Sequence, residues 1–160
     1  MNKLKAAILA STMALTFTRA YALGDLTLDG VTKDYVSNIG DTTLLSSNIK
    51  TVKTIGGLVM RDTQAGSVDN TGDMESWGGW ITNLSAIGTI HLTDTQIEHD
   101  VIVKHSDWTK WTDVFLTVDR TEIYLDSSRI EGTLNCISPC VIKKNYNSYI
   151  GAVKGNVDSQ

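Results

Sequence analysis

The chain has 160 residues, and its 18 acidic residues outnumber its 14 lysines and arginines, which gives a formal net charge of −4. Aromatic residues make up only 7% of the chain, and proline occurs once. A chain of this length is one domain's worth and can bury a sizeable core. Its acidic balance lacks the basic patch that nucleic-acid binding requires, so no nucleic-acid partner is expected.

The N-terminal segment 1–22 has the three parts of a secretory signal peptide. Two lysines precede a short apolar stretch at residues 6–18, and Ala20-Tyr21-Ala22 is a small-x-small cleavage site. We therefore expect an exported protein, at the cell surface, outside the cell or in the periplasm, whose mature chain begins near Leu23. Its charge would be 11 − 18 = −7 after the loss of three cations. The apolar stretch is too short to span a bilayer, and no transmembrane helix is expected in the mature chain.

Residues 23–142 show the alternation of apolar and polar residues that is typical of half-buried β-strands. The rhythm is clear at Ile90 and Leu92 and again at Val101 and Val103. Thr, Val and Ile dominate these segments, as strands prefer. Glycines with Asp, Asn or a second glycine punctuate the segments as turns. The region is therefore predicted to be a β domain, followed by a polar tail or cap at residues 143–160.

A longer pattern repeats within this domain. Residues 77–98 contain W-x-x-W and then I-x-L-x-x-[ST]-x-I-E, and residues 108–131 contain both motifs again. The tryptophan motifs are offset by 31 positions (108 − 77) and the isoleucine motifs by 33 positions (123 − 90). A constant offset of this size points to one supersecondary unit that is used several times.

The repeat extends toward the N-terminus without its tryptophans. Residues 58–65 match the segment 32 positions later, and residues 26–29 match more weakly another 32 positions back. Residues 44–49 resemble residues 125–130, although this match is out of phase with the main period. The sequence thus predicts about four degenerate units between residues 24 and 140.

These features predict an all-β fold built from repeats, a β-solenoid or β-helix-like protein. Each unit would supply two short coils, and stacking of the units would bury a core that no single unit could bury. The alternative is an antiparallel β-sandwich, because turns at intervals of about 8 to 12 residues also fit that fold. A small transmembrane barrel fits less well, since the aromatic residues are too few for two girdles.

Cys136 and Cys140 flank the sequence Ile-Ser-Pro. In an oxidising compartment such a close pair is expected to form a local disulfide. The loop that it closes is short, so its stabilisation of the whole fold should be small and its role is to hold a turn. The C-x-x-C spacing of a redox-active dithiol is not present.

Four tryptophans are the main candidates for ligand binding: Trp77, Trp80, Trp108 and Trp111. An indole face is large and polarisable and suits a sugar ring or a cation. Glycines 78 and 79 would leave one face of the first pair open. Paired tryptophans at a fixed repeat would contact an extended polymer such as a glycan, or they would stack on one another as architecture.

The polar residues give no convincing catalytic or metal site. His91 lies between two apolar residues and should face away from the core, and His99, Asp100 and His105 form at most a loose group. No nucleophile elbow and no H-E-x-x-H spacing occurs. Glu98 and Glu131 occupy equivalent repeat positions, whereas a catalytic acid pair needs different environments. No catalytic residue, metal or cofactor is therefore predicted.

The sequence-based hypothesis is an exported, non-enzymatic β-repeat protein, a cell-surface structural or fibre subunit or an adhesin-like interaction module. Self-association, a cell-surface partner or a glycan would be its partners. The alternative is a carbohydrate-binding module or a glycan-active enzyme that uses the paired tryptophans.

Overall fold

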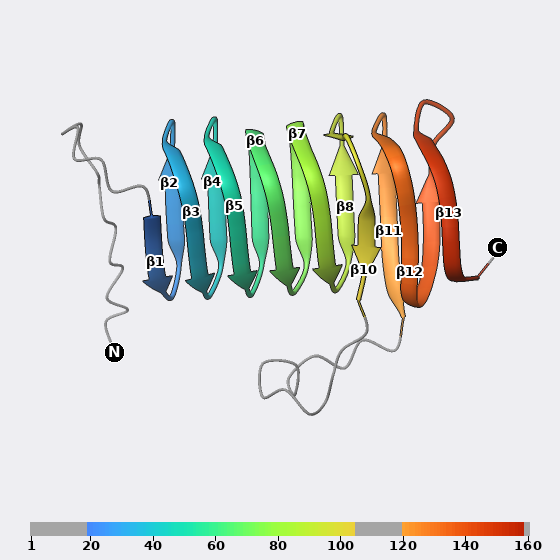
Figure 1. Ribbon diagram of the computed structural model, residues 1–160, viewed down its shortest axis with the longest axis horizontal. Coiled ribbons are helices and arrows are strands. Elements are labelled where there is room, and N and C mark those ends of the chain that lie inside the picture. Colours follow the sequence, from blue (N-terminus) through green and yellow to red (C-terminus); the bar gives the residue numbers. More distant parts are fainter. Residues whose placement is uncertain (1–18, 105–119, 159–160) are drawn as a thin grey trace, which may run out of the picture.

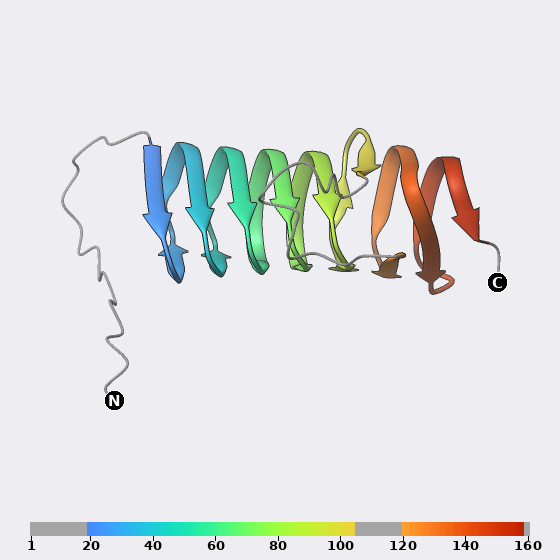
Figure 2. The same ribbon diagram turned by 90° about the horizontal axis from the view of Figure 1, so that it is seen from below.

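The chain forms a β-solenoid of about eight coils, seen in a computed structural model that describes residues 19–104 and 120–158. Figures 1 and 2 show the coils side by side along one axis, with β1 and β13 at opposite ends. The strands are β1 (Arg19–Leu23), β2 (Leu26–Asp29), β3 (Thr32–Ile39), β4 (Thr42–Leu45), β5 (Asn48–Ile55), β6 (Leu58–Thr71), β7 (Met74–Ile87), β8 (Ile90–Thr93), β9 (Gln96–Ile97), β10 (Val101–Val103), β11 (Thr121–Asp126), β12 (Arg129–Lys144) and β13 (Tyr149–Asp158).

Every strand pairing among the described residues is parallel. An antiparallel sandwich would pair neighbouring strands in opposite directions, so the solenoid prediction is confirmed and the sandwich alternative is wrong.

The N-terminal coils follow one another at a constant offset in sequence. Val36 pairs with Val52, Val52 with Val68, and Val68 with Leu84, each partner lying 16 positions further along the chain (52 − 36). The repeat unit of 32 positions read from the sequence is therefore two coils in this half of the protein. Residues 44–49, which looked out of phase, lie one coil away from residues 60–65 and belong to the same rows.

The unit length was wrong in the C-terminal half. Ile90 pairs directly with Ile123 although the two are 33 positions apart (123 − 90), so this step is one coil and not two. In sequence, residues 105–119 separate β10 from β11, and they are outside the described residues. An inserted segment and a doubled coil have nearly the same length here, which is why the sequence period did not separate them.

Each coil has two β faces. The first face comprises β2, β4, β8, β11, residues 58–61 of β6, residues 74–77 of β7 and residues 140–144 of β12. The second face comprises β1, β3, β5, β9, β10, residues 149–155 of β13 and the remaining parts of β6, β7 and β12. The end of β13 returns to the first face, where Val157 pairs with Cys140 and Asp158 with Val141.

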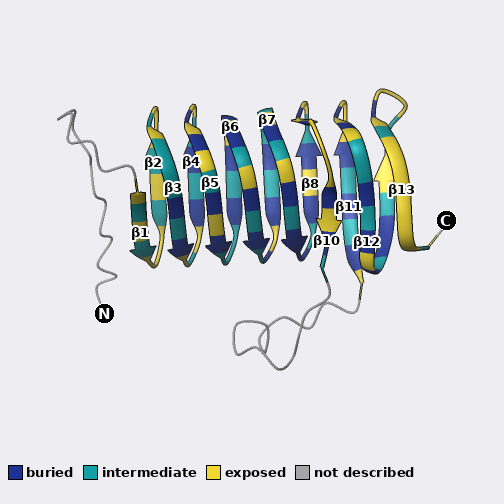
Figure 3. Cartoon of the chain, viewed as in Figure 1, coloured by how far each residue is buried: buried dark blue, intermediate teal, exposed yellow. Residues whose placement is uncertain are grey.

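Alternate residues of both faces point inward and form the core (Figure 3). Equivalent residues of successive coils lie in four inner rows. Buried members are Leu58, Met74 and Ile90 in the first row, Leu44, Met60 and Leu92 in the second, Ile49, Ile81 and Ile97 in the third, and Val36, Val52 and Val68 in the fourth. One continuous apolar core thus runs along the axis.

In six coils, the corner that leads from the first face to the second contains a residue in the left-handed backbone conformation. Six residues with φ between 45° and 67° stack there: Gly30, Ser46, Asp62, Gly78, Asp94 and Ser127. Asp and Ser accept this conformation more readily than bulky residues do. In four of these six coils the next position carries a buried hydroxyl. Ser47 N donates to Thr63 Oγ1 at 3.4 Å, and Thr95 N donates to Ser128 Oγ at 3.1 Å.

The opposite corner is closed by side chains in two different ways. In the N-terminal half, Asn70 Nδ2 donates to the carbonyl oxygen of Gly72 at 2.7 Å, and Asn38 makes the same bond to Gly40 at 3.2 Å. In the last coils the Cys136–Cys140 disulfide spans this corner, which confirms the predicted pairing. Cys136 stands two coils after Ala86 in the row to which Asn70 belongs, so the disulfide replaces the amide as the clamp.

Strand β1 contains the predicted cleavage site. It pairs in parallel with β3, Ala22 lying opposite Asn38. Cleavage after Ala22 would remove all of this strand except Leu23. The second face would then begin at β3.

Candidate binding site

The first tryptophan pair turns the left-handed corner between the two faces. Trp77 lies on the first face and Trp80 on the second, with Gly78 and Gly79 between them in left-handed conformations. Trp77 is half-buried, whereas Trp80 is 38% exposed. The W-x-x-W motif therefore places two indoles on either side of one edge of the solenoid.

A shallow surface depression lies at this edge and is lined by Arg61, Asp62, Trp77, Gly78 and Asp94, which we call the Trp77 corner. Asp62, Gly78 and Asp94 are successive members of the left-handed row. Because Gly78 has no side chain, the Asp62 carboxylate can lie close to the backbone of the next coil. A Cβ atom on Gly78 would lie 2.6 Å from Asp62 Oδ1, so a larger residue would displace that carboxylate.

Arg61 covers part of the indole. Its guanidinium carbon lies 4.8 Å from the centre of the Trp77 ring, within the range of a cation–π contact. On the other side, Trp77 pairs with Thr93, a much smaller neighbour. The corner thus combines one partly open aromatic ring, a cation and two carboxylates within three coils.

The second glycine brings adjacent coils unusually close. A Cβ atom on Gly79 would lie 2.3 Å from the carbonyl oxygen of Thr63. Gly79 also interrupts the row of buried hydroxyls, and Thr95 Oγ1 instead bonds to Ser76 Oγ at 3.0 Å. At this coil the Ser76 hydroxyl therefore replaces the hydroxyl that is missing at Gly79 as the partner of Thr95.

The structure describes two of the four predicted tryptophans, Trp77 and Trp80. Trp108 and Trp111 lie outside the described residues, so their match to the first pair stays a prediction. Sequence reasoning missed Arg61 and Asp62 as partners of Trp77. The signal that would have found them is the spacing of 16, since Arg61 pairs with Trp77 in the neighbouring coil (77 − 61).

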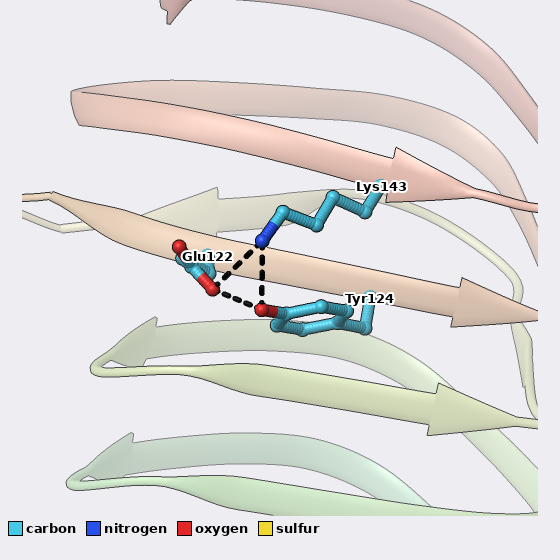
Figure 4. A network of polar contacts seen from close by, with 3 residues as sticks. All are labelled: Glu122, Tyr124 and Lys143. Atoms are coloured by element: carbon cyan, nitrogen blue, oxygen red, sulfur yellow. Dashed lines mark hydrogen bonds and ion pairs between the residues drawn. The ribbon is translucent and has the colours of Figure 1, made fainter.

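A second group of polar side chains lies on the first face near the C-terminal end. His91 is exposed, as predicted, and its ring stacks on Tyr124 with 4.3 Å between the ring centres. Lys143 Nζ donates to the Tyr124 hydroxyl at 2.9 Å and lies 3.2 Å from a Glu122 carboxylate oxygen (Figure 4). Tyr124 donates its phenolic proton to Glu122. These contacts tie three successive coils together.

This group should respond to pH. The hydrogen bond from Tyr124 and then that from Lys143 lower the pKa of Glu122. A lowered folded-state pKa gives stability that is present above the unfolded-state pKa and is lost as pH falls through the folded value. We expect a carboxyl NMR titration to show a pKa for Glu122 below its ordinary value, and the Tyr124→Phe variant to raise it. An unchanged pKa in that variant would contradict the assignment of the phenol as the main cause.

Two of the other candidate residues, Asp100 and Glu131, make structural contacts. Asp100 Oδ1 accepts a hydrogen bond from the backbone N–H of Thr133 at 2.8 Å, and His99 is exposed, whereas His105 lies outside the described residues. Glu131 pairs with Arg129 at 2.8 Å. Within residues 19–104 and 120–158, no group of three His, Cys, Asp or Glu residues is arranged to hold a metal.

Comparison of the chain with protein-family models, with curated proteins and with solved structures finds no match. In the described part of the chain, no helix is long and apolar enough to cross a membrane. The fold defines the chain as a β-solenoid protein.

Proposed function

We propose that this protein is an exported, non-enzymatic β-solenoid that acts as an adhesin-like interaction module. The rigid stack would hold its outward rows at fixed spacing, and the Trp77 corner would be the surface that contacts the partner. The N-terminal signal-peptide pattern supports the export part of this proposal.

The observation that carries the proposal is the shallow depression lined by Asp62, Gly78 and Asp94 beside the Trp77 ring. Amphipathic aromatic rings are enriched at interaction surfaces because they bury a large area. Two carboxylates and the Arg61 guanidinium add hydrogen-bond acceptors and donors at the rim. A polar partner with an apolar patch suits this combination.

The second candidate is a carbohydrate-binding module. Trp80 is 38% exposed on the adjoining face, and sugar hydroxyls pair readily with carboxylates and guanidinium groups. A fibre subunit is a third form of the proposal, because among the described strands β2 pairs only with β4 and has one unpaired edge. The three differ in what the purified protein binds: a cell-surface protein, a glycan or another copy of itself.

The test compares the wild-type protein with a Trp77→Ala, Asp94→Ala variant on glycan arrays, immobilised surface proteins and whole cells. We expect wild-type binding to one of these targets and a loss of about tenfold or more in affinity for the variant, equivalent to about 1.4 kcal/mol. Tyr146→Ala is the matched control, because Tyr146 is 94% exposed and lies in the turn before β13.

Equal binding by the wild-type protein and the double variant would contradict a role for the Trp77 corner. Release of shortened sugars from a bound glycan would contradict the non-enzymatic part. Export is tested separately by N-terminal sequencing of the secreted protein, which should begin at Leu23; a cytoplasmic protein that retains Met1 would exclude it.

A further inference from the structure

Export would uncover one edge of the second face at strand β3. This step rests on the proposed function, because it requires cleavage after Ala22. Residues 19–22 of β1 pair with residues 35–38 of β3, and only the pair of Leu23 with Ile39 would remain. The backbone of β3 would therefore lose its neighbour on one side, while β5 stays paired with it on the other side.

The uncovered edge lacks the devices that usually protect a strand edge. Residues 35–39 contain neither a charged residue nor a proline. Val36, which is completely buried, would lose Ala20 as its neighbour in the core. The ring of Tyr35 would lose the ring of Tyr21, whose centre lies 5.5 Å away. An unprotected edge with apolar residues is a template for the addition of another strand.

One buried atom at this edge has no partner. Asn38 is 1% exposed, and its side-chain oxygen Oδ1 accepts no hydrogen bond from the described part of the chain. The amide is fixed in this orientation, because Nδ2 donates to the carbonyl oxygens of Gly24 at 2.8 Å and Gly40 at 3.2 Å. A reversed amide would place its oxygen against both carbonyls. A buried acceptor without a donor costs free energy, so this coil lacks one hydrogen-bond donor.

An equivalent residue further along the row shows which group supplies that donor. Asn70 lies two coils after Asn38 and makes the same bond to the carbonyl oxygen of its corner glycine, Gly72. Its Oδ1 accepts a hydrogen bond of 2.6 Å from Thr54 Oγ1 in the preceding coil. The neighbour that precedes Asn38 in the row is Ala22, which has no hydroxyl. A serine or threonine at this position would satisfy Asn38 as Thr54 satisfies Asn70.

We propose that the exported protein binds an extended segment of a partner protein along β3, as a parallel strand in the place of β1. The segment carries an apolar residue opposite Val36 and a serine or threonine opposite Asn38. The apolar residue covers the core again, and the hydroxyl donates to Asn38 Oδ1. Added strands gain affinity from main-chain hydrogen bonds and specificity from alternate side chains. The Trp77 corner is formed by later coils, so both surfaces can be occupied at once.

The test uses a peptide with the sequence of β5, residues 48–55, because β5 holds this position in front of β6. In the same register on β3, Val52 of the peptide would lie opposite Val36 and Thr54 opposite Asn38. The secreted protein is titrated into labelled peptide and binding is followed by fluorescence anisotropy. We expect binding, and a loss of about fivefold or more in affinity for the Thr54→Val peptide, which lacks the donor for the buried oxygen.

The matched control is the Thr51→Val peptide. Thr51 belongs to the outward row of Tyr35 and Ser67, so its hydroxyl would not reach the core. The two altered peptides have the same composition and differ only in which row carries the valine. We expect the control peptide to bind as tightly as the unaltered one.

Hydrogen exchange locates the bound peptide. We expect the peptide to protect the backbone amides of residues 35–39 and to leave the exchange of residues 74–77 unchanged. The full chain produced without export retains residues 19–22 on β3, and it should bind the peptide about tenfold more weakly or less, because β1 covers the edge.

Four results would overturn the proposal: no binding of the unaltered peptide, equal affinities of the two altered peptides, binding without protection of residues 35–39, or equal binding by the chain that retains β1. Self-association of the secreted protein along β3 would assign the edge to a second copy and would also overturn it. N-terminal sequencing separates a failure of cleavage from a failure of docking. The Trp77→Ala, Asp94→Ala variant should bind the peptide like the wild-type protein, so the test of the Trp77 corner is independent of this one.

Discussion

Replacement of Gly72 by alanine should destabilise the protein by about 3 kcal/mol or more, a large part of the stability of a typical domain. Gly72 has a φ of +137°, and a Cβ atom there would lie 2.3 Å from the carbonyl oxygen of Gly56 in the preceding coil. The Gly56 carbonyl group and the Cα atom of Gly72 both belong to backbone that the neighbouring coils hold in place, so neither can move away easily. Urea unfolding followed by circular dichroism measures the effect.

Gly30→Ala is the control that separates strain from crowding. Gly30 also has a positive φ, +61°, but a Cβ atom there would meet no other atom within 4 Å. Its loss should be about 1 to 2 kcal/mol, the cost of the left-handed conformation alone. Equal losses at Gly30 and Gly72 would show that the close approach of the coils is not what makes Gly72 necessary.

Replacement of Ile81 by alanine should cost about 2 to 5 kcal/mol, as large-to-small changes in a core do. Ile81 is completely buried and lies in an inner row between Ala65 and Ile97. Ala65 is already small, so the new cavity has no bulky neighbour on that side to fill it. The free energy of unfolding from a urea titration gives the value.

The outward-facing Ile102→Ala serves as the comparison for Ile81→Ala. Ile102 is 37% exposed, and we expect a loss of less than about 1 kcal/mol. In a linear array each coil contacts only its neighbours, so a cavity at Ile81 weakens the junction between the two halves of the stack. A loss at Ile81 no larger than that at Ile102 would contradict the continuous core.

The fold class was predictable because the alternation of apolar residues and the period of 32 positions both survive in the sequence. The coil length of 16 was harder to see, since adjacent coils place different residues in one row. Leu44, Met60 and Ser76 are successive members of the same inner row, yet they share little chemistry. Their shared position in the coil and their burial make them equivalent, and a comparison of residue types does not detect that.

The candidate site was predictable only in part. The W-G-G-W motif predicted Trp77 as a candidate binding residue. The residues that surround Trp77 belong to neighbouring coils, and they can be identified only when the coil length is known. Arg61 and Asp94 lie 16 and 17 positions from Trp77 in sequence, and both line the same depression.

The corner that follows the second face differs in length from coil to coil. Ala86, Val103 and Cys136 are equivalent positions before it, and Gly88, Thr121 and Cys140 are the positions after it. The chain therefore crosses this corner in steps of 2, 18 and 4 positions (88 − 86, 121 − 103, 140 − 136), while the strands on both sides stay in register. New segments can enter the gene at this corner without disturbing the core, so a solenoid of this kind can diversify its surface while it conserves its scaffold.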